Sequence, residues 1–418
     1  MRRRSRDDGR WGGGEFTARL VAAEVGLDLH EGQVKLILFL GSGISRASGL
    51  PLAGELTEAI IGSPALPQAA DALNPRLRDP ELQERIKGLL RIMGDFETRD
   101  AKRTNALFRG PISYEDLFHL CEEMTNWRMG LADNSALTSF MKALEHRARP
   151  LLSGANLAAR LNDLGLLARD ARLWIQSVTT TMLRAGTPTG LELIVELARC
   201  KRIAELNIVT LNHDTLVEQL MEENNIELID GFGPPDGDIR WYDDRLYDTY
   251  RTPARLFKLH GSISWYRFVD DGLPRTAVVR RSDGGELFDG KGKQLQRWIE
   301  GASFLTGGNK AIRYQHGIYL DLLFRFQEVL RGCDVMLMCG YGWGDAAINL
   351  RLDTWMDDPR KRIVLLHPNP EEITTRSMII ASAYTWWVSS GRLTTVPRWL
   401  SQVALGEIER SLFDPLAA

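Results

Sequence analysis

The sequence predicts an α/β protein with an open, Rossmann-like parallel sheet, helices on both faces and a large helical insertion after the first strand, loop and helix. Three observations lead to this prediction. A nearly uninterrupted apolar run, Val34 to Leu40, precedes a loop rich in glycine and serine. Only helical patterns follow between residues 68 and 200. Short apolar runs then alternate with helical patterns, which is typical of a parallel sheet covered by helices.

Length and charge limit the classes of protein that fit. The 418 residues exceed an average domain, and the net charge of −3 is not that of a strongly basic nucleic-acid binder. No apolar run approaches the 18 residues or so of a membrane span. Residues 1–14 are rich in Arg and Gly and are not followed by the apolar core of a signal peptide. We therefore expect a flexible basic arm on a cytoplasmic protein.

The four cysteines are widely spaced: Cys121, Cys200, Cys333 and Cys339. None forms a C-x-x-C pair, so the sequence predicts neither a zinc site nor a disulfide framework. No other grouping of residues indicates a metal ligand set.

The loop from Gly41 to Pro51 is the first candidate site. A buried strand, a loop of small residues and a helix over 52–61 together offer backbone N–H groups and a helix N-terminus to a phosphate. A tight turn without a ligand is the alternative. The dehydrogenase fingerprint requires a third glycine where this chain has Arg46. A nucleotide is therefore predicted, and hydride transfer is disfavoured.

The following segment predicts helices over 81–93, 114–127, 136–146, 156–183 and 191–198. Ser113 and Asp116 have the spacing of an N-cap with an acidic first turn, which marks one helix start. We expect a domain division into the arm, 1–14, a nucleotide-binding part, 15–66 and 200–418, and a helical insertion, 67–199.

Later strands are expected at 206–211, 226–229, 256–259, 334–339 and 362–366. Helices are expected at 346–356, 370–381 and 398–412. Residues 234–246 and 280–293 are expected to be long surface loops. In an open parallel sheet, ligands bind beyond the carboxyl ends of the strands, so the residues that follow each strand are the candidates for chemistry.

Polar residues do follow these strands. Asn212 and Asp214 come after the second strand, and His260 follows a later one. Capping of the following helix would account for Asp214 but not for Asn212. An isolated histidine such as His260 is more often a core residue. A second glycine-rich turn begins at Gly340, and His367 and Asn369 close the last expected strand.

The order of four motifs is more specific than any one of them. Gly-Ser-Gly-Ile-Ser at 41–45, Thr-Leu-Asn-His-Asp at 210–214, Leu-His-Gly-Ser at 259–262 and Gly-Tyr-Gly-Trp-Gly-Asp at 340–345 stand in the order found in the sirtuin family of NAD-consuming enzymes, which the chain resembles. The resemblance covers residues 34–51 and 206 to about 370. It is closest to the divergent bacterial branch found in anti-phage defence, in which the sirtuin-type domain degrades NAD.

The resemblance implies roles for individual residues. The dinucleotide phosphates and ribose would be contacted by Gly41, Ser42, Gly43 and Ser45. Asn212 and His260 would be catalytic, and Asp214 would lie near the nicotinamide. Gly340 and Tyr341 would lie near the phosphates and adenosine ribose, with His367 and Asn369 near the adenosine.

Departures from the family pattern narrow the expected activity. Deacylating sirtuins have Asp-Phe-Arg where this chain has Leu52-Ala53-Gly54, and they carry two cysteine pairs that hold a structural zinc. We therefore expect an NAD hydrolase without structural zinc. The alternatives are an NAD-dependent deacylase or ADP-ribosyltransferase, and a catalytically silent NAD- or ADP-ribose-binding assembly subunit. The resemblance also implies a homo-oligomer or a partner such as a HerA-type ATPase. Arg46 is the only residue of the sequence that would favour NADP over NAD as the ligand.

Overall fold

The computed structural model describes residues 33–62, 75–104, 112–132, 134–249, 254–280, 285–298, 301–307, 314 and 316–414. The expected basic arm, 1–14, lies outside these residues. Within the described ranges, no helix is both long and apolar enough to cross a membrane.

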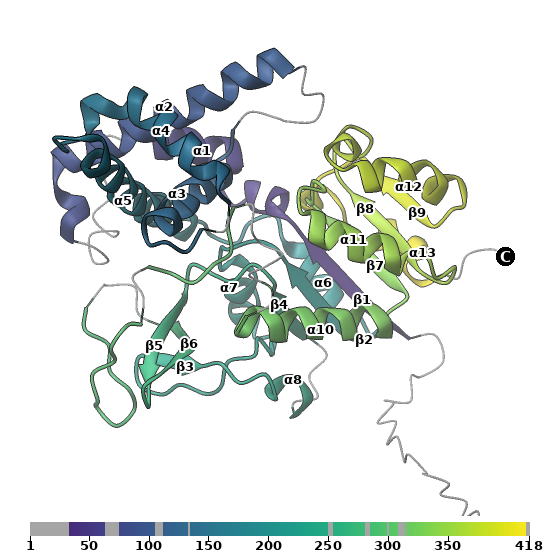
Figure 1. The fold of residues 1–418 in the computed structure, drawn as a ribbon. Helices are drawn as coiled ribbons and strands as arrows, with labels where there is room; N and C mark the ends of the chain where they lie inside the picture. Colours follow the sequence, from purple (N-terminus) through teal and green to yellow (C-terminus); the bar gives the residue numbers. More distant parts are fainter. Residues whose placement is uncertain are drawn as a thin grey trace, which may run out of the picture.

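A six-stranded sheet forms the centre of the molecule (Figure 1). Its order is β4-β2-β1-β7-β8-β9, and every neighbouring pair is parallel. The strands are β1 (Val34–Leu40), β2 (Ile203–Thr210), β4 (Ala254–Lys258), β7 (Val335–Cys339), β8 (Arg362–Leu366) and β9 (Leu393–Val396). The predicted α/β fold with an open parallel sheet is confirmed.

Both faces of this sheet are buried, which explains why its strands are apolar without alternation. In β1, Leu36, Leu38 and Leu40 join one hydrophobic core. Ile37 and Phe39 point the other way and join a second core. Successive side chains of a strand face opposite sides, so a strand covered on both faces needs apolar residues throughout.

Different helices cover the two faces. The core that contains Leu36 includes residues of α1 (Ala53–Gly62), α6 (Glu192–Arg199), α7 (Leu216–Glu223) and α13 (Leu405–Phe413). The core that contains Phe39 includes residues of α10 (Ile318–Gly332), α11 (Ala346–Trp355) and α12 (Met378–Ser389). Figure 1 shows α11 and α12 near β7 and β8, whereas α10 runs beside β4 and β1.

Four helices follow α1 and pack together as a helical segment beside the sheet (Figure 1). They are α2 (Pro80–Thr104), α3 (Tyr114–Arg128), α4 (Ala136–Ala148) and α5 (Leu157–Arg184). Ser113 is the predicted N-cap of α3, and with Asp116 it forms a capping box. Trp174 of α5 donates its indole N–H to the Ile60 carbonyl at 2.9 Å, which ties the segment to α1. The helices predicted for this part of the chain are confirmed.

A small antiparallel sheet, β3-β6-β5, was not predicted. It consists of β3 (Ile239–Trp241), β5 (Trp265–Asp270) and β6 (Leu273–Val279), so part of the expected loop 234–246 is a strand. The β5–β6 turn contains Asp271 and Gly272, both with positive φ, at 46° and 79°. Asp-Gly between two runs of β-forming residues is a hairpin signal, so the sequence did contain the information.

Three other predictions need correction. Residues 226–229 are not a strand, because only Ile229 makes an isolated bridge, to Arg255. The helix expected at 370–381 is divided, since Ser377 adopts an extended conformation with φ −140° and caps α12. The helix expected at 398–412 likewise becomes a short 3₁₀ turn, Leu400–Gln402, followed by α13. Strand β9 was missed because it is short and contains two threonines.

Candidate functional site

The candidate residues lie along one edge of the central sheet. His260, Asn212, Gly41, Gly340 and His367 follow β4, β2, β1, β7 and β8, and the five strands are adjacent in that order. With about 4.8 Å between neighbouring strands, the row from His260 to His367 spans roughly 19 Å. The structure thus brings residues more than 300 positions apart in the chain to one carboxyl edge.

The strand order has a direct consequence for ligand binding. Taken in chain order along the central sheet, the strands read 3-2-1-4-5-6, which is the order of dinucleotide-binding Rossmann sheets. The chain moves outward from β1 through β2 to β4, and then outward on the other side from β7 to β9. The order therefore reverses between β1 and β7, where Gly41 and Gly340 stand. This switch point is where ligands bind in open α/β sheets.

The two glycine-rich loops pack directly on each other at this point. A Cβ atom on Gly41 would lie 2.6 Å from the Gly340 carbonyl oxygen, and one on Gly340 would lie 2.6 Å from the Ile44 nitrogen. The Gly43 amide donates to the Gly340 carbonyl at 3.0 Å, and the Gly41 amide donates to the Cys339 carbonyl at 2.9 Å. These glycines allow the loops to touch, and the amides of Gly41 and Gly43 are used within the protein rather than presented to a phosphate. Ser42, which begins a 3₁₀ turn, is exposed.

Asn212, Ser45 and Asp214 form one hydrogen-bonded cluster. The Asn212 Nδ2 group donates to the Gly41 carbonyl at 3.2 Å and to the Ser45 hydroxyl at 3.1 Å. Ser45 in turn donates to Asp214 Oδ2 at 2.8 Å, and Asp214 Oδ1 accepts the Leu216 amide at 3.2 Å. The cluster joins the end of β2 to the loop after β1. Asp214 therefore both accepts a hydrogen bond from the first residue of α7 and anchors Ser45.

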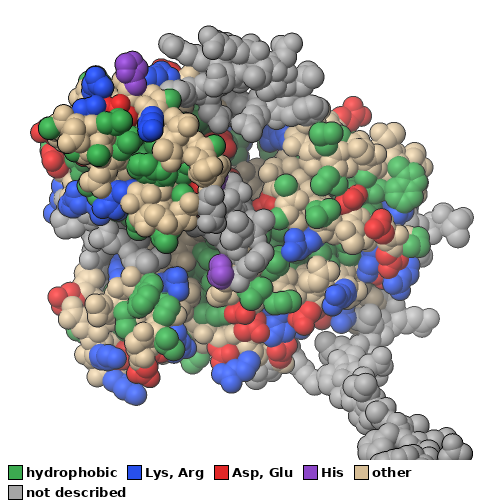
Figure 2. All heavy atoms as spheres, in the orientation of Figure 1, with side chains coloured by type: hydrophobic (Ala, Val, Ile, Leu, Met, Phe, Trp, Pro, Cys, Tyr) green, Lys and Arg blue, Asp and Glu red, His purple; other side chains and the backbone are tan. Residues whose placement is uncertain are grey.

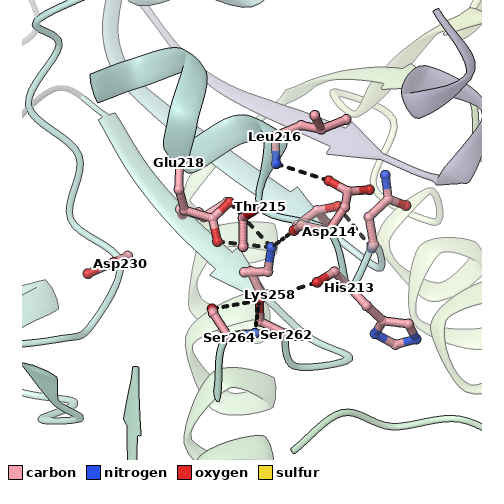
Figure 3. A network of polar contacts seen from close by, with 12 residues as sticks. His213, Asp214, Thr215, Leu216, Glu218, Asp230, Lys258, Ser262 and Ser264 are labelled. Atoms are coloured by element: carbon pink, nitrogen blue, oxygen red, sulfur yellow. Dashed lines mark hydrogen bonds and ion pairs between the residues drawn. The ribbon is translucent and has the colours of Figure 1, made fainter. Parts of the chain in front are cut away.

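A buried lysine supports this cluster from the neighbouring strand (Figure 3). Lys258, at the end of β4, is 3% exposed, contacts the Asp214 carbonyl oxygen and lies 3.0 Å from Glu218. Burial raises the pKa of Glu218, and the charge of Lys258 opposes that rise. Lys258 was not predicted as a site residue. The signal was a lysine at the end of an otherwise apolar strand, Leu256 to Leu259.

His260 is paired with an acid from the other half of the sheet. Its Nε2 atom lies 3.0 Å from Asp345 Oδ2, and the Tyr314 hydroxyl donates to the same oxygen at 3.4 Å. The other oxygen of Asp345 accepts the Ile348 amide at 3.0 Å and caps α11. Burial, reinforced by the Asp345 charge, raises the pKa of Tyr314 well above its ordinary value, which keeps this phenol a donor. Asp345 was absent from the predicted site.

The loop that carries His260 is held by its neighbours on both sides. The His213 ring lies 6.1 Å from the His260 ring and 4.6 Å from the ring of Phe304, measured between centroids. The Leu305 amide donates to the His260 carbonyl at 2.6 Å. The Ser262 hydroxyl donates to the His213 carbonyl at 3.2 Å (Figure 3). Together these contacts fix the imidazole next to the end of β2.

The residues predicted at the adenosine end differ in exposure. The Tyr341 side chain is buried and donates to Asn349 Oδ1 at 2.8 Å, so it packs into the core instead of lining an open surface. His367 lies 5.8 Å from the Trp399 ring, and its Nδ1 accepts the Asn369 amide at 3.1 Å. Burial lowers the pKa of His367, so the neutral imidazole is favoured. Asn369 is exposed.

Access to the edge is narrow. Asn212 is 8% exposed, Asp214 5% and His260 4%. A pocket of about 210 Å³ adjoins the glycine loop and is lined by Gly43, Arg46 and Trp399, among others. Among the residues that the structure describes, no group of three or more His, Cys, Asp or Glu side chains could hold a metal ion.

Comparison with known proteins assigns part of the chain to a family. The family model of the SIR2-like domain matches residues 206–385, which contain Asn212, Asp214, His260, Gly340 and His367. No curated protein matches the chain.

Solved structures that match the chain include a Sir2 homologue in complex with NAD, at 13% sequence identity, a TM-score of 0.32, and coverage of 91% of this chain and 90% of the other. A mutant Sir2 homologue in complex with ADP-ribose is 14% identical with the same TM-score, and the match covers 81% of this chain and 82% of the other. Residues 206–385 of the chain thus match a SIR2-like domain.

Proposed function

We propose that the chain is an NAD⁺ hydrolase that cleaves the bond between nicotinamide and ribose. One observation carries the proposal: Asn212 and His260 stand at the ends of adjacent strands, beside the glycine loop, in a sheet with dinucleotide-binding order. Adjacent strand ends are close enough for both side chains to act on one sugar. NAD would extend along the edge, with nicotinamide near β2 and β4 and adenosine toward β8.

Breaking this bond requires little acid catalysis. The nicotinamide leaves from a cationic state, and the reaction passes through an oxocarbenium-like transition state, as in glycoside hydrolysis. The protein must orient the ribose and supply a nucleophile. Asn212 makes both of its bonds through Nδ2, so among the described residues its Oδ1 is not engaged and can accept a hydrogen bond from a water or a ribose hydroxyl.

His260 is the proposed base. It would accept a proton from the ribose hydroxyl or the attacking water, a step worth roughly 10²–10⁴-fold. The Asp345 carboxylate at 3.0 Å would stabilise the imidazolium that forms and fix the orientation of the ring. Asp214 holds Ser45 and, through it, Asn212, so we assign it to positioning in addition to its proposed place near the nicotinamide.

We further propose that activity is controlled, because an enzyme that destroys NAD without restraint would harm its cell. The low exposure of Asn212 and His260 supports this, since NAD reaches them only after the surrounding loops open. A homo-oligomer or a HerA-type ATPase partner would supply the opening, as expected for an anti-phage effector in the cytoplasm. The proposed division assigns NAD binding to 15–66 and 200–418, and assembly to the helical insertion, 67–199.

One assay separates the candidate activities. The purified chain is incubated with NAD alone and then with an acetylated peptide, and nicotinamide is measured. Release without peptide supports the hydrolase, and release only with peptide shows a deacylase or transferase. If no nicotinamide forms in either case or after oligomerisation, but NAD still binds, the chain is a silent assembly subunit. Wild-type activity in Asn212→Ala or His260→Ala would remove that residue from catalysis.

A further inference from the structure

A second and larger pocket adjoins the carboxyl edge, because its wall residues Phe304 and Leu305 contact His213 and His260. Its volume is about 750 Å³, within the range of small-molecule sites. It lies between α3 and α5 of the helical segment on one side and β5 and β6 of the small sheet on the other, with residues 302–305 and 316–321 completing the wall. Gly41, Asn212 and His260 are not among its lining residues. We refer to it as the arginine pocket.

The arginine pocket is strongly cationic. Its lining includes Arg76, Arg169, Arg172, Arg267 and Arg275, whereas Asp321 is the carboxylate among the described lining residues. Figure 2 shows Lys and Arg side chains gathered along the edge of the helical segment that faces the small sheet. Such a surface attracts anions.

Two nearby carboxylates pair with arginines of the lining. Asp170 pairs with Arg76 at 3.4 Å and with Arg169 at 2.8 Å, so one acid serves two guanidinium groups. Arg275 pairs with Asp270 at 2.6 Å. Neither carboxylate pairs with Arg267.

Arg267 is the most informative of these cations. It projects from β5 and is only partly exposed, and its guanidinium has no ion pair or hydrogen bond to any residue that the structure describes. Desolvating a cation without a partner is costly, and guanidinium matches phosphate oxygens in two-point contacts. An anionic ligand in the pocket would supply the missing partner.

Aromatic rings line the same pocket: Phe118, Tyr242, Phe304 and Tyr319. The wall that carries Phe304 is already fixed, because the Ser303 amide donates to the Trp265 carbonyl at 2.7 Å and the Ser303 and Tyr319 hydroxyls lie 3.0 Å apart. Arginines bind phosphates, and aromatic rings stack on flat bases. Phe118 and Phe304 are buried, whereas Tyr242 and Tyr319 are partly exposed and are the rings that could stack on a base.

We propose that the arginine pocket binds a phosphorylated nucleotide, separately from the NAD edge, with the phosphates at Arg267 and its neighbours and the base against the aromatic rings. The site does not depend on NAD cleavage, so its test is a binding measurement. ATP is titrated calorimetrically into the full chain, into Arg267→Gln and into Arg360→Gln. Arg360 is a matched control because it is an exposed arginine, 72% accessible and paired with Asp358, that does not line this pocket.

The expected result is binding of ATP to the wild type, binding about 10- to 100-fold weaker to Arg267→Gln, and unchanged binding to Arg360→Gln. This factor corresponds to the loss of one charge-assisted phosphate contact. Equal affinity of Arg267→Gln and wild type, or no binding of ATP to the wild type, would overturn the proposal. Adenosine and tripolyphosphate are each expected to bind more weakly than ATP. If tripolyphosphate or polyglutamate binds as tightly as ATP, the pocket recognises charge alone and the nucleotide assignment is wrong.

Discussion

The contact between the two glycine loops can be tested with Gly41→Ala. Gly41 has φ −117° and ψ 179°, an extended conformation that alanine adopts without strain. Any cost therefore comes from the added methyl group, which would meet the Gly340 oxygen and the Tyr341 Cα at 2.6 Å. Both are backbone atoms, so no rotamer change relieves the clash, and the loops must separate by about 0.8 Å to reach ordinary contact at 3.4 Å.

The magnitude follows from two terms. Overpacking a tight contact costs about 1–3 kcal/mol, and separating the loops also weakens the Gly43–Gly340 hydrogen bond, worth about 1 kcal/mol. We expect the free energy of unfolding to fall by about 2–4 kcal/mol, and NAD cleavage to fall with it because Asn212 bonds to the Gly41 carbonyl.

The assay is urea unfolding followed by tryptophan fluorescence and circular dichroism, with nicotinamide release measured on the same samples. Gly54→Ala is the matched control. Gly54 lies in the first turn of α1 with nothing within 4 Å of the position that an added methyl group would occupy, and alanine is favoured over glycine in helices by about 0.5–1 kcal/mol. This control should be as stable as the wild type or slightly more so. If Gly41→Ala matches the wild type within about 0.5 kcal/mol, the direct packing of the loops is wrong.

Three further predictions follow from the site. His260→Ala should lower the rate of nicotinamide release roughly 10²–10⁴-fold without changing the circular dichroism spectrum, whereas an unchanged rate would exclude it as the base. Asp345→Asn should preserve the cap of α11 and therefore the thermal stability. The rate of nicotinamide release at saturating NAD should nevertheless fall about 10-fold or more. A loss of stability with no loss of rate would indicate that Asp345 has a structural role. His367→Gln should reduce the acid sensitivity of the fold. Burial lowers the pKa of His367 in the folded state, so the unfolded chain binds the proton at a higher pH than the folded chain does. The free energy of unfolding of the wild type should therefore decrease as the pH falls below the ordinary value of 6.5, and that of the variant should decrease less. If the free energies of unfolding of the two proteins change equally with pH over a range of about 7.5 to 5.5, the prediction for His367 is wrong.

The sequence alone determined the local elements and the identity of the edge residues. Helices α3 and α5 follow from periodicity and from N-caps such as Ser113, and the buried strands follow from unbroken apolar runs. These features depend on near neighbours in the chain, which is why they can be read from one sequence. The positions of Asn212 and His260 immediately after strands also follow from local pattern.

Tertiary structure decided which strands are neighbours and which side chains meet. Asp345 lies 85 positions from His260, and no local pattern pairs them; they meet because β4 and β7 belong to the same sheet and the loops after these strands converge. Likewise, the sequence indicated only that the glycines of the first loop could bind a phosphate. The structure shows that Gly41 and Gly340 also allow the backbones of the loops after β1 and β7 to come into contact. The arginine pocket has the same origin, because α5 and β5 are far apart in the chain and only packing brings Arg169 and Arg267 to one cavity. Long-range packing is a property of the whole core, and a sequence pattern does not encode it residue by residue.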